Sequence, residues 1–589
     1  MTERTIDYRF MTRRKFVQTS AFGLSTLALM PLLAACGDDD DDEVEDTGSD
    51  PTEADAGGSG PEPTATGAAE ESAPTAADPT ATPQSEDASE AGSSGAGPYS
   101  YAPATGVEWD ELVVGVQGLP ATVDPAAGMG NVGTRVTYTP YDMLIRRDFL
   151  NNNELVPSLA LSWERVSDTV LELKLREGVT FHNGDPFSAA DVVFTFERLL
   201  AAGDDSVLAE AKTYFLTMEA IEKVDDFTVR IVTTEPDPLI INRLASWASW
   251  IVPKTLIETV GHDEFMQTGM GTGPFKIASF DPDNELVLER YDGYWGDAAP
   301  LKRLTFRVIP EIAARVTALI NDEVQIITNV PPDQVSAIND ASNVQVRSIP
   351  LANAHILYYN THHPAIADKK LRQALNISID RQLIIDTIWS GEAVPKRSHQ
   401  FEEYGPLFNP DRPYSPYDPD RARQLVEEST YDGAVVEYQL AAGYYTNGEQ
   451  VAQAIVPMWQ EVGINAEVRI SEEFLSGEER IVHTGSNSSI LADPDGVLWR
   501  AWGAGSSQQV NYWDAPAEFN ELGEEARRTL DQQKRYDNYQ RMLDIWEEEA
   551  PGAVLFDPVE FYGVNRSINW SPYSFYYMDF RAYNLSFNE

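Results

Sequence analysis

The sequence predicts an α/β protein with several domains. It has 589 residues, 42% of them apolar, and is long enough to bury more than one hydrophobic core. Its second half alternates short apolar runs, typical of strands, with amphipathic stretches typical of helices, which favours helices layered on parallel or mixed sheets. In chain order, the expected elements are strands at 112–116, 170–175, 304–309, 355–360 and 466–470, with helices at 136–145, 313–320, 368–379 and 450–462 and two long helices within 516–549.

The N-terminal segment, residues 1–36, reads as an export signal. Arg13 and Arg14 precede an uncharged stretch from Thr19 to Ala35, and the paired arginines resemble a twin-arginine signal. The stretch ends in Leu33-Ala34-Ala35-Cys36, which resembles a lipobox. We therefore expect Cys36 to be lipidated and to anchor the protein in the cell envelope, in the periplasm or on the outer face of the cytoplasmic membrane. The alternative is an uncleaved membrane helix, although this stretch is at the short end of spanning length.

Residues 37–106 form the next compositional segment. They contain no Lys or Arg and consist mainly of Asp, Glu, Gly, Ser, Ala, Thr and Pro in low-complexity order. A segment with so few apolar residues cannot build a core, so we expect a disordered acidic tether.

Overall charge and cysteine content exclude several classes of function. The formal net charge of -51 argues against nucleic acid or anionic lipid surfaces as partners, since both attract Lys and Arg patches. The single cysteine excludes internal disulfides and cysteine-based zinc sites. No catalytic, metal-binding or cofactor-binding motif is found, so we expect a protein that is not an enzyme and has no cofactor.

The passage from Arg176 to Leu199 carries the strongest local signals. An Asn-Gly turn follows a strand pattern, and Ser188 with Asp191 predicts a capping box at the start of a helix. His182 invites a catalytic interpretation, but no nucleophile or second histidine stands at a suitable spacing, so a structural role is expected. Further along, Asp418 followed by Pro419 predicts another helix start.

The same passage closely resembles the hallmark of the family 5 extracellular solute-binding proteins, the dipeptide-, oligopeptide- and nickel-binding subunits of ABC importers. Further matches follow in the family's order and together span about residues 107 to 585. They are Gly271-Thr272-Gly273-Pro274-Phe275, Tyr291-Asp292-Gly293-Tyr294-Trp295-Gly296, Leu371-Arg372-Gln373-Ala374-Leu375 with Ile379-Asp380-Arg381, Tyr417-Asp418-Pro419, and Asp493-Pro494-Asp495-Gly496.

The resemblance implies the two-lobed periplasmic-binding-protein fold, with a hinge of two strands and an extra domain on lobe one. The expected parts are 107–150, 267–350 and 551–589 for lobe one, 151–266 for the extra domain, and 351–550 for lobe two. The two crossings between the lobes are expected at Ile349-Pro350 and Ala550-Pro551.

The resemblance also places one wall of the ligand cleft on lobe two. The candidate ligand-binding residues there are Asp493, Asp495, Trp499, Arg500, Trp502, Tyr512 and Trp513. Alternatively, Trp499 and Trp502 are the buried face of a helix. Lys396 and Arg397 lie where relatives often place a loop that faces the far end of the ligand. Peptide-binding relatives carry an acid at the position of Ile490, so the sequence departs from the peptide-binding pattern there.

The function implied is a solute receptor that closes around a small molecule and delivers it to an ABC permease in the membrane. A short peptide is the leading ligand. An oligosaccharide, which would stack on the tryptophans, is the alternative, and an envelope receptor or chaperone without transport is the further one.

Overall fold

The computed structural model describes residues 105–588, which fall within one compact unit. The expected signal, Cys36 and nearly all of the expected tether lie outside the described residues. Among residues 105–588, no helix is both long and apolar enough to span a bilayer.

A seven-stranded mixed sheet, in the order β12-β19-β11-β1-β10-β9-β8, forms the first layer. Its centre is β1 (Trp109–Val116), a strand whose second half is fully buried and which runs parallel to both neighbours. The other strands are β8 (Phe275–Asp281), β9 (Glu285–Arg290), β10 (Leu301–Val308), β11 (Ile326–Ile327), β12 (Val344–Pro350) and β19 (Val559–Asn565), and the nearby helices are α8 (Ile312–Ile320) and α9 (Val335–Asn339).

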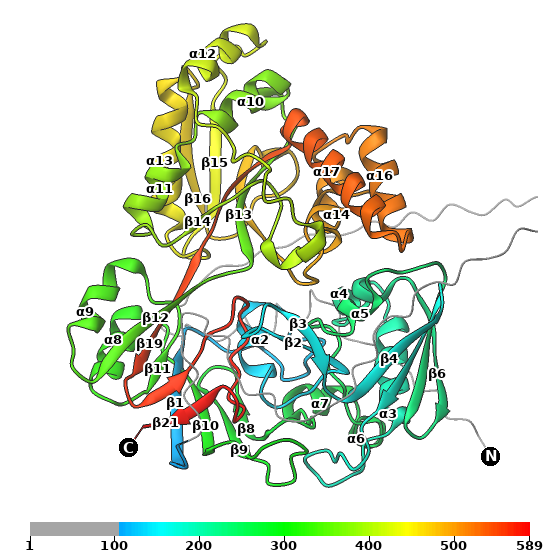
Figure 1. The fold of residues 1–589 in the computed structure, drawn as a ribbon. Coiled ribbons are helices and arrows are strands. Elements are labelled where there is room, and N and C mark those ends of the chain that lie inside the picture. Colours follow the sequence, from blue (N-terminus) through cyan, green and yellow to red (C-terminus); the bar gives the residue numbers. More distant parts are fainter. Residues whose placement is uncertain (1–104, 589) are drawn as a thin grey trace, which may run out of the picture. The chain divides into compact units, whose positions relative to one another are not determined.

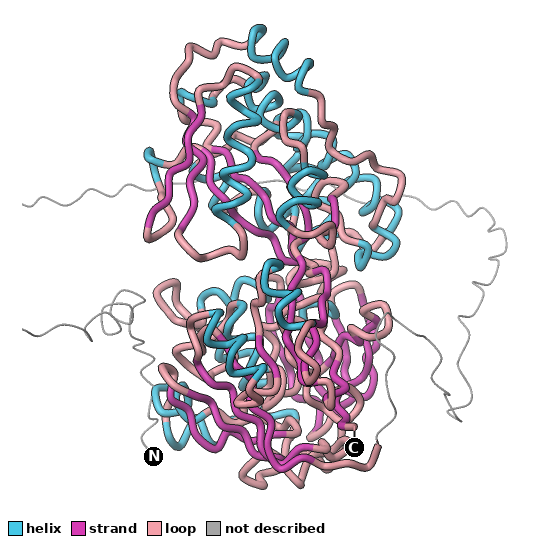
Figure 2. The backbone as a smooth tube through the Cα atoms, turned by 90° about the vertical axis from the view of Figure 1, so that its left-hand side faces the viewer, coloured by secondary structure: helices cyan, strands magenta, loops and turns pink. Residues whose placement is uncertain are grey.

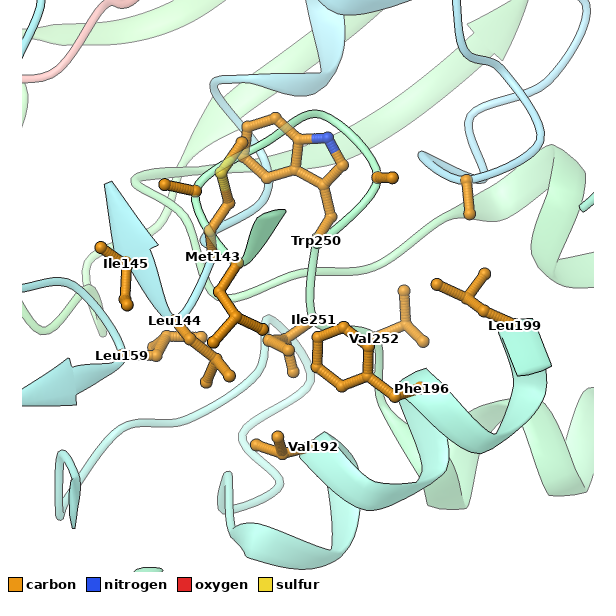
Figure 3. Close-up of a cluster of buried hydrophobic side chains, with 14 of the residues drawn as sticks. Met143, Leu144, Ile145, Leu159, Val192, Phe196, Leu199, Trp250, Ile251 and Val252 are labelled. Atoms are coloured by element: carbon orange, nitrogen blue, oxygen red, sulfur yellow. The ribbon is translucent and has the colours of Figure 1, made fainter. Parts of the chain in front are cut away.

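A four-stranded antiparallel sheet, in the order β4-β5-β7-β6, packs against the helix predicted from the capping box. That helix is α3 (Ala189–Leu200), and both hydrogen bonds of the box between Ser188 and Asp191 are present. Its apolar face meets Ile251 and Val252 in a buried cluster (Figure 3). The strands are β4 (Ala160–Ser167), β5 (Val170–Leu175), β6 (Met218–Asp225) and β7 (Thr228–Thr233). We call these two sheets and their helices lobe one.

Lobe two contains a six-stranded mixed sheet in the order β14-β18-β13-β17-β15-β16. Helices cover both of its faces (Figures 1 and 2). The strands are β13 (Asn353–Tyr359), β14 (Val394–Pro395), β15 (Val436–Ala441), β16 (Ala466–Ser471), β17 (Val482–Ser488) and β18 (Gly552–Asp557). The helices are α10 (Lys369–Ile377), α11 (Arg381–Ile388), α12 (Pro419–Glu428), α13 (Gly448–Glu461), α14 (Leu498–Trp502), α15 (Ser507–Asn511), α16 (Ala517–Arg528) and α17 (Gln532–Glu549).

Strand β13 shows why lobe two has two separate cores. Its side chains alternate between the faces of the sheet, as the pleat of a strand requires. Leu357 and Tyr359 join the core formed with α10 to α13. Ile356 and Tyr358 join the core formed with α14, α16 and α17.

Shorter elements complete the chain. Among the described residues they are α2 (Asn131–Thr137), α4 (Ala209–Lys212), α5 (Ile240–Arg243), α6 (Lys254–Val260), α7 (His262–Thr268), the pairs β2 (Ile145–Asp148) with β3 (Glu154–Pro157) and β20 (Ile568–Trp570) with β21 (Leu585–Phe587), and six short 3-10 segments, η1 (Thr213–Phe215), η2 (Pro332–Gln334), η3 (Pro364–Ile366), η4 (Glu402–Leu407), η5 (Gly477–Glu479) and η6 (Pro494–Gly496).

Two expectations need correction. The helix predicted at 136–145 ends at Thr137, and Ile145 begins a strand, because Pro140 cannot continue a helix and biases the residue before it toward extended backbone. The chain crosses between the sheets after Pro350, as predicted, but its second crossing lies at Pro558, between β18 and β19. The position expected from the family resemblance, Ala550-Pro551, instead precedes β18, which still belongs to the sheet of lobe two. The remaining domain boundaries stay predictions.

The family-like motifs of lobe one meet one another in space. His182 lies against the glycine-rich turn, with a ring nitrogen 3.0 Å from the carbonyl oxygen of Gly273. The Tyr291 hydroxyl lies 2.9 Å from the carbonyl oxygen of Phe181 and 2.7 Å from the hydroxyl of Thr180. These contacts give His182 a structural setting, since its neighbours are backbone and a tyrosine ring.

A cavity between the lobes as the candidate binding site

A small cavity lies between the two lobes. Its volume is about 10 Å³ for the centre of a water molecule, which is room for about one water. Lobe one contributes Arg147, Phe149, Ala245, Phe575 and Tyr577, and lobe two contributes Ala352, Glu403, Ser489 and Ile490.

Arg147 brings a positive charge to this cavity from strand β2. Its side chain is 5% exposed, and its Nε and Nη2 atoms have no hydrogen-bond partner among the described residues. Burial lowers the pKa of Arg147, and the charge of Glu403 is the strongest of the effects that oppose this shift. An unsatisfied buried guanidinium is costly, so the N–H bonds of these two nitrogens are available to an anionic group of a ligand.

Glu403 brings the opposite charge from the 3-10 turn η4 of lobe two. Burial of its carboxyl group raises its pKa, while its contact with the Ser489 side chain and the charges of Arg147 and Lys396 act in the other direction. The lining of the cavity therefore combines a basic group from lobe one with an acidic group from lobe two. A small zwitterion that met both charges would favour the closed arrangement of the lobes.

The remaining lining is mostly apolar. Phe575 and Tyr577 pack with their ring centroids 4.8 Å apart, and Phe149 lies 5.7 Å from Tyr577. Ile490, at the position where peptide-binding relatives carry an acid, lines the same cavity and is 5% exposed. The negative charge at this site thus comes from Glu403 instead of position 490.

The two predicted acids of lobe two form buried ion pairs inside the protein. Arg535 of α17 donates from Nη2 to both carboxylate oxygens of Asp493 at 2.8 Å. Asp495 accepts from Arg527 at 2.9 Å and from Arg243 of lobe one at 3.3 Å. Both acids have partners already, so Asp493 ties a turn to a helix and Asp495 ties the two lobes together.

The three predicted tryptophans belong to the hydrophobic core. Trp499, Trp502 and Trp513 are buried in the cluster under α16 and α17. Trp502 contacts the rings of Trp513 and Trp546 with centroids 5.9 and 5.3 Å away. The alternative interpretation, a buried helix face, describes Trp499 and Trp502, because their spacing of three puts them on one side of α14.

The other predicted residues differ in their availability. Lys396 is buried and pairs with Asp557 at 2.9 Å, beside the second crossing. Arg397 donates to the carbonyl oxygen of Arg412 at 2.5 Å and lies over the Tyr414 ring. Tyr512 is buried under the guanidinium of Arg480.

Arg500 is the exposed member of the predicted set. It donates from Nε to its own helix turn at Gly496 and has no carboxylate within ion-pair distance among the described residues. It remains available to a ligand.

Sequence reasoning missed Arg147 and Glu403. Neither lies in a motif, and the strand and the turn that carry them are far apart in the chain. The only available signal was indirect: Ile490 in the place of an acid implies that another group supplies the charge.

Comparison with known proteins decides the family. The model of the bacterial extracellular solute-binding proteins, family 5, matches residues 154–514. The chain belongs to this family. Its curated relatives include the di/tripeptide-binding protein 3 of Pseudomonas aeruginosa, which is 27% identical over 80% of this chain and 93% of the relative. The dipeptide-binding protein of Escherichia coli is 28% identical over 70% of this chain and 83% of its own length.

Solved structures of the family share the fold. The periplasmic binding protein DppA from Helicobacter pylori, in complex with the peptide STSA, superposes with a TM-score of 0.71 at 23% identity. The match covers 82% of this chain and 99% of that one. The expected two-lobed family 5 architecture is therefore confirmed.

Proposed function

We propose that this protein captures a short peptide between its lobes and delivers it to an ABC permease. The observation that supports a zwitterionic ligand is the unpartnered guanidinium of Arg147 opposite Glu403 in the cavity between the lobes. The carboxylate of a peptide would bind Arg147 and its amino group would bind Glu403; this requires the lobes to part further, because the cavity as it stands has room for about one water. The peptide-binding relatives support the same class of ligand.

The cavity also favours a peptide over an oligosaccharide. The stacking platform that a sugar would need was expected on Trp499, Trp502 and Trp513, and all three are buried in the core. A neutral sugar could not form an ion pair with either Arg147 or Glu403.

Calorimetry with capped peptides tests this function. The full chain, extracted in detergent, is titrated with alanyl-alanine, its N-acetyl form and its amide. We expect each cap to weaken binding about ten- to hundredfold, because each removes one charge-assisted contact. In Glu403→Gln the penalty for N-acetylation should vanish while the penalty for amidation remains. Absence of peptide binding, or equal affinity for all three forms, would contradict the proposal.

The membrane attachment is proposed from the sequence, through a lipid on Cys36. Each buried methylene of an acyl chain contributes about 0.8 kcal/mol of membrane affinity, which the acidic segment after Cys36 cannot replace. Fractionation of cells that express Cys36→Ser should show the protein in the soluble fraction. Continued membrane association would favour an uncleaved helix instead.

A further inference from the structure

Residues 235–243 of lobe one make polar contacts with lobe two. Asn242 donates from Nδ2 to the carbonyl oxygen of Leu491 at 2.7 Å. Arg243, the last residue of α5, donates from Nη2 to Oδ2 of Asp495 at 3.3 Å. Leu491 and Asp495 are both buried, so these two contacts between the lobes are shielded from water.

A further contact between the same segments lies nearer the solvent. Arg528, the last residue of α16, pairs with Glu235 at 2.5 Å, and both side chains are partly exposed. We call the contacts of Asn242, Arg243 and Arg528 with the opposite lobe the latch.

The latch lies next to the cavity on both lobes. Ala245 lines the cavity from lobe one and follows Arg243 by two residues. Ile490 lines it from lobe two and directly precedes Leu491. A movement of the lobes that widens the cavity at Ala245 and Ile490 therefore also pulls the latch residues apart.

The two buried charges of the latch also have partners within their own lobes. Arg243 donates from Nε to Asp237 at 3.1 Å, and Asp495 accepts from Arg527 at 2.9 Å. When the lobes part, each of these charges keeps that partner, and water replaces the contact across the lobes. Opening therefore leaves no buried charge unpaired, which would otherwise be costly, and the latch can open and close reversibly.

The latch contacts join groups of the protein itself, so they form in the closed arrangement whether or not a peptide is bound. We propose that the latch holds the lobes closed between binding events and that its opening limits how fast a peptide enters and leaves. The inference rests on the proposed function, because it takes the space between the lobes as the binding site. Since the latch stabilises the closed form with and without peptide, its loss should speed entry and release together and change the dissociation constant much less.

Stopped-flow fluorescence on the full chain measures this gate. Trp247 packs against Phe575 of the cavity lining with ring centroids 5.6 Å apart, so tryptophan fluorescence reports the binding of alanyl-alanine. In the wild type, the observed rate should reach a plateau as the peptide concentration rises, because opening becomes limiting. The double variant Asn242→Ala, Arg528→Gln should raise this plateau about tenfold, since it loses a hydrogen bond to a buried carbonyl and a surface ion pair.

Arg541→Gln is the matched control. Arg541 pairs with Glu518 at 2.8 Å between two helices of lobe two, and its side chain is about as exposed as that of Arg528. This variant should keep the wild-type plateau. A wild type without a plateau, or a double variant that lowers the plateau or leaves it unchanged, would overturn the inference while leaving peptide binding intact.

Hydrogen exchange without peptide separates the latch from the proposed function. Phe575 and Tyr577 line the cavity from lobe one, and mass spectrometry follows the fragment that contains them. This fragment should exchange severalfold faster in the double variant than in the wild type or Arg541→Gln, because the lobes open more often. Equal exchange in all three proteins would overturn the inference. Faster exchange in a double variant of a protein that binds no dipeptide would support the latch and contradict the proposed function.

Discussion

The Asp493–Asp495 turn and the Arg147–Glu403 cavity use charge in opposite ways. At the turn, each acid is held by arginines at 2.8 to 3.3 Å, and these ion pairs connect segments of the protein. At the cavity, the guanidinium of Arg147 keeps two nitrogen atoms, Nε and Nη2, without a partner among the described residues. The difference shows that a conspicuous cluster of charges in a sequence can be entirely internal, while the groups left for a ligand lie in segments without a motif.

The largest expected effect comes from breaking an ion pair of the turn. Arg535→Met leaves the carboxylate of Asp493 buried and unpaired, so we expect the free energy of unfolding to fall by about 3 to 5 kcal/mol. Urea unfolding followed by circular dichroism measures this change. Arg147→Met removes an unpaired charge and should lower stability little or raise it. Equal destabilisation by the two substitutions would erase the distinction between the two regions.

The next largest effect on stability comes from the buried histidines His355 and His399. Their protonated, charged forms would have no partner of opposite charge among the described residues. Burial lowers the pKa of His355 to about 4 and that of His399 to about 3. Below pH 6.5 these histidines become protonated in the unfolded chain, whereas in the folded protein their imidazoles stay neutral down to a lower pH. The free energy of unfolding should therefore fall as the pH drops from 6.5 toward 4, by up to about 1.4 kcal/mol per pH unit for each histidine.

Urea unfolding between pH 7.5 and 4.5 measures this slope. His399→Gln should reduce the slope of the free energy of unfolding against pH by the contribution of one proton, about 1.4 kcal/mol per pH unit. His362→Gln, at an exposed position, serves as the control. An unchanged slope in His399→Gln would mean that this ring accepts its proton in the folded state.

Local features of the fold could be predicted from the sequence, and the site could not. The capping box at Ser188 and the helix start at Asp418 depend on neighbours within three residues, and both are present. The family motifs also specified the two lobes. Arg147 and Glu403 become partners in one site only after strand β2 and turn η4 meet across the cleft, and no local pattern encodes this meeting.

The role of the tryptophans could not be decided from the sequence for a related reason. Their composition fits a binding wall and a buried core equally well, and burial is decided by α16 and α17, which follow later in the chain. Arg500 stays a candidate, because the structure leaves it exposed with its Nε bonded only within its own turn.

Peptide binding by two adjacent arginine variants tests the central claim most directly. Arg146 and Arg147 are neighbours on β2 and point to opposite sides, and Arg146 donates to the Tyr583 hydroxyl at 2.6 Å, away from the cavity lining. Calorimetry with alanyl-alanine and its amide should show that Arg147→Met weakens binding of the free dipeptide about ten- to hundredfold and removes the difference between the two forms. Arg146→Met should bind as the wild type does. Wild-type affinity for alanyl-alanine in Arg147→Met would contradict the assignment of Arg147 as the carboxylate anchor.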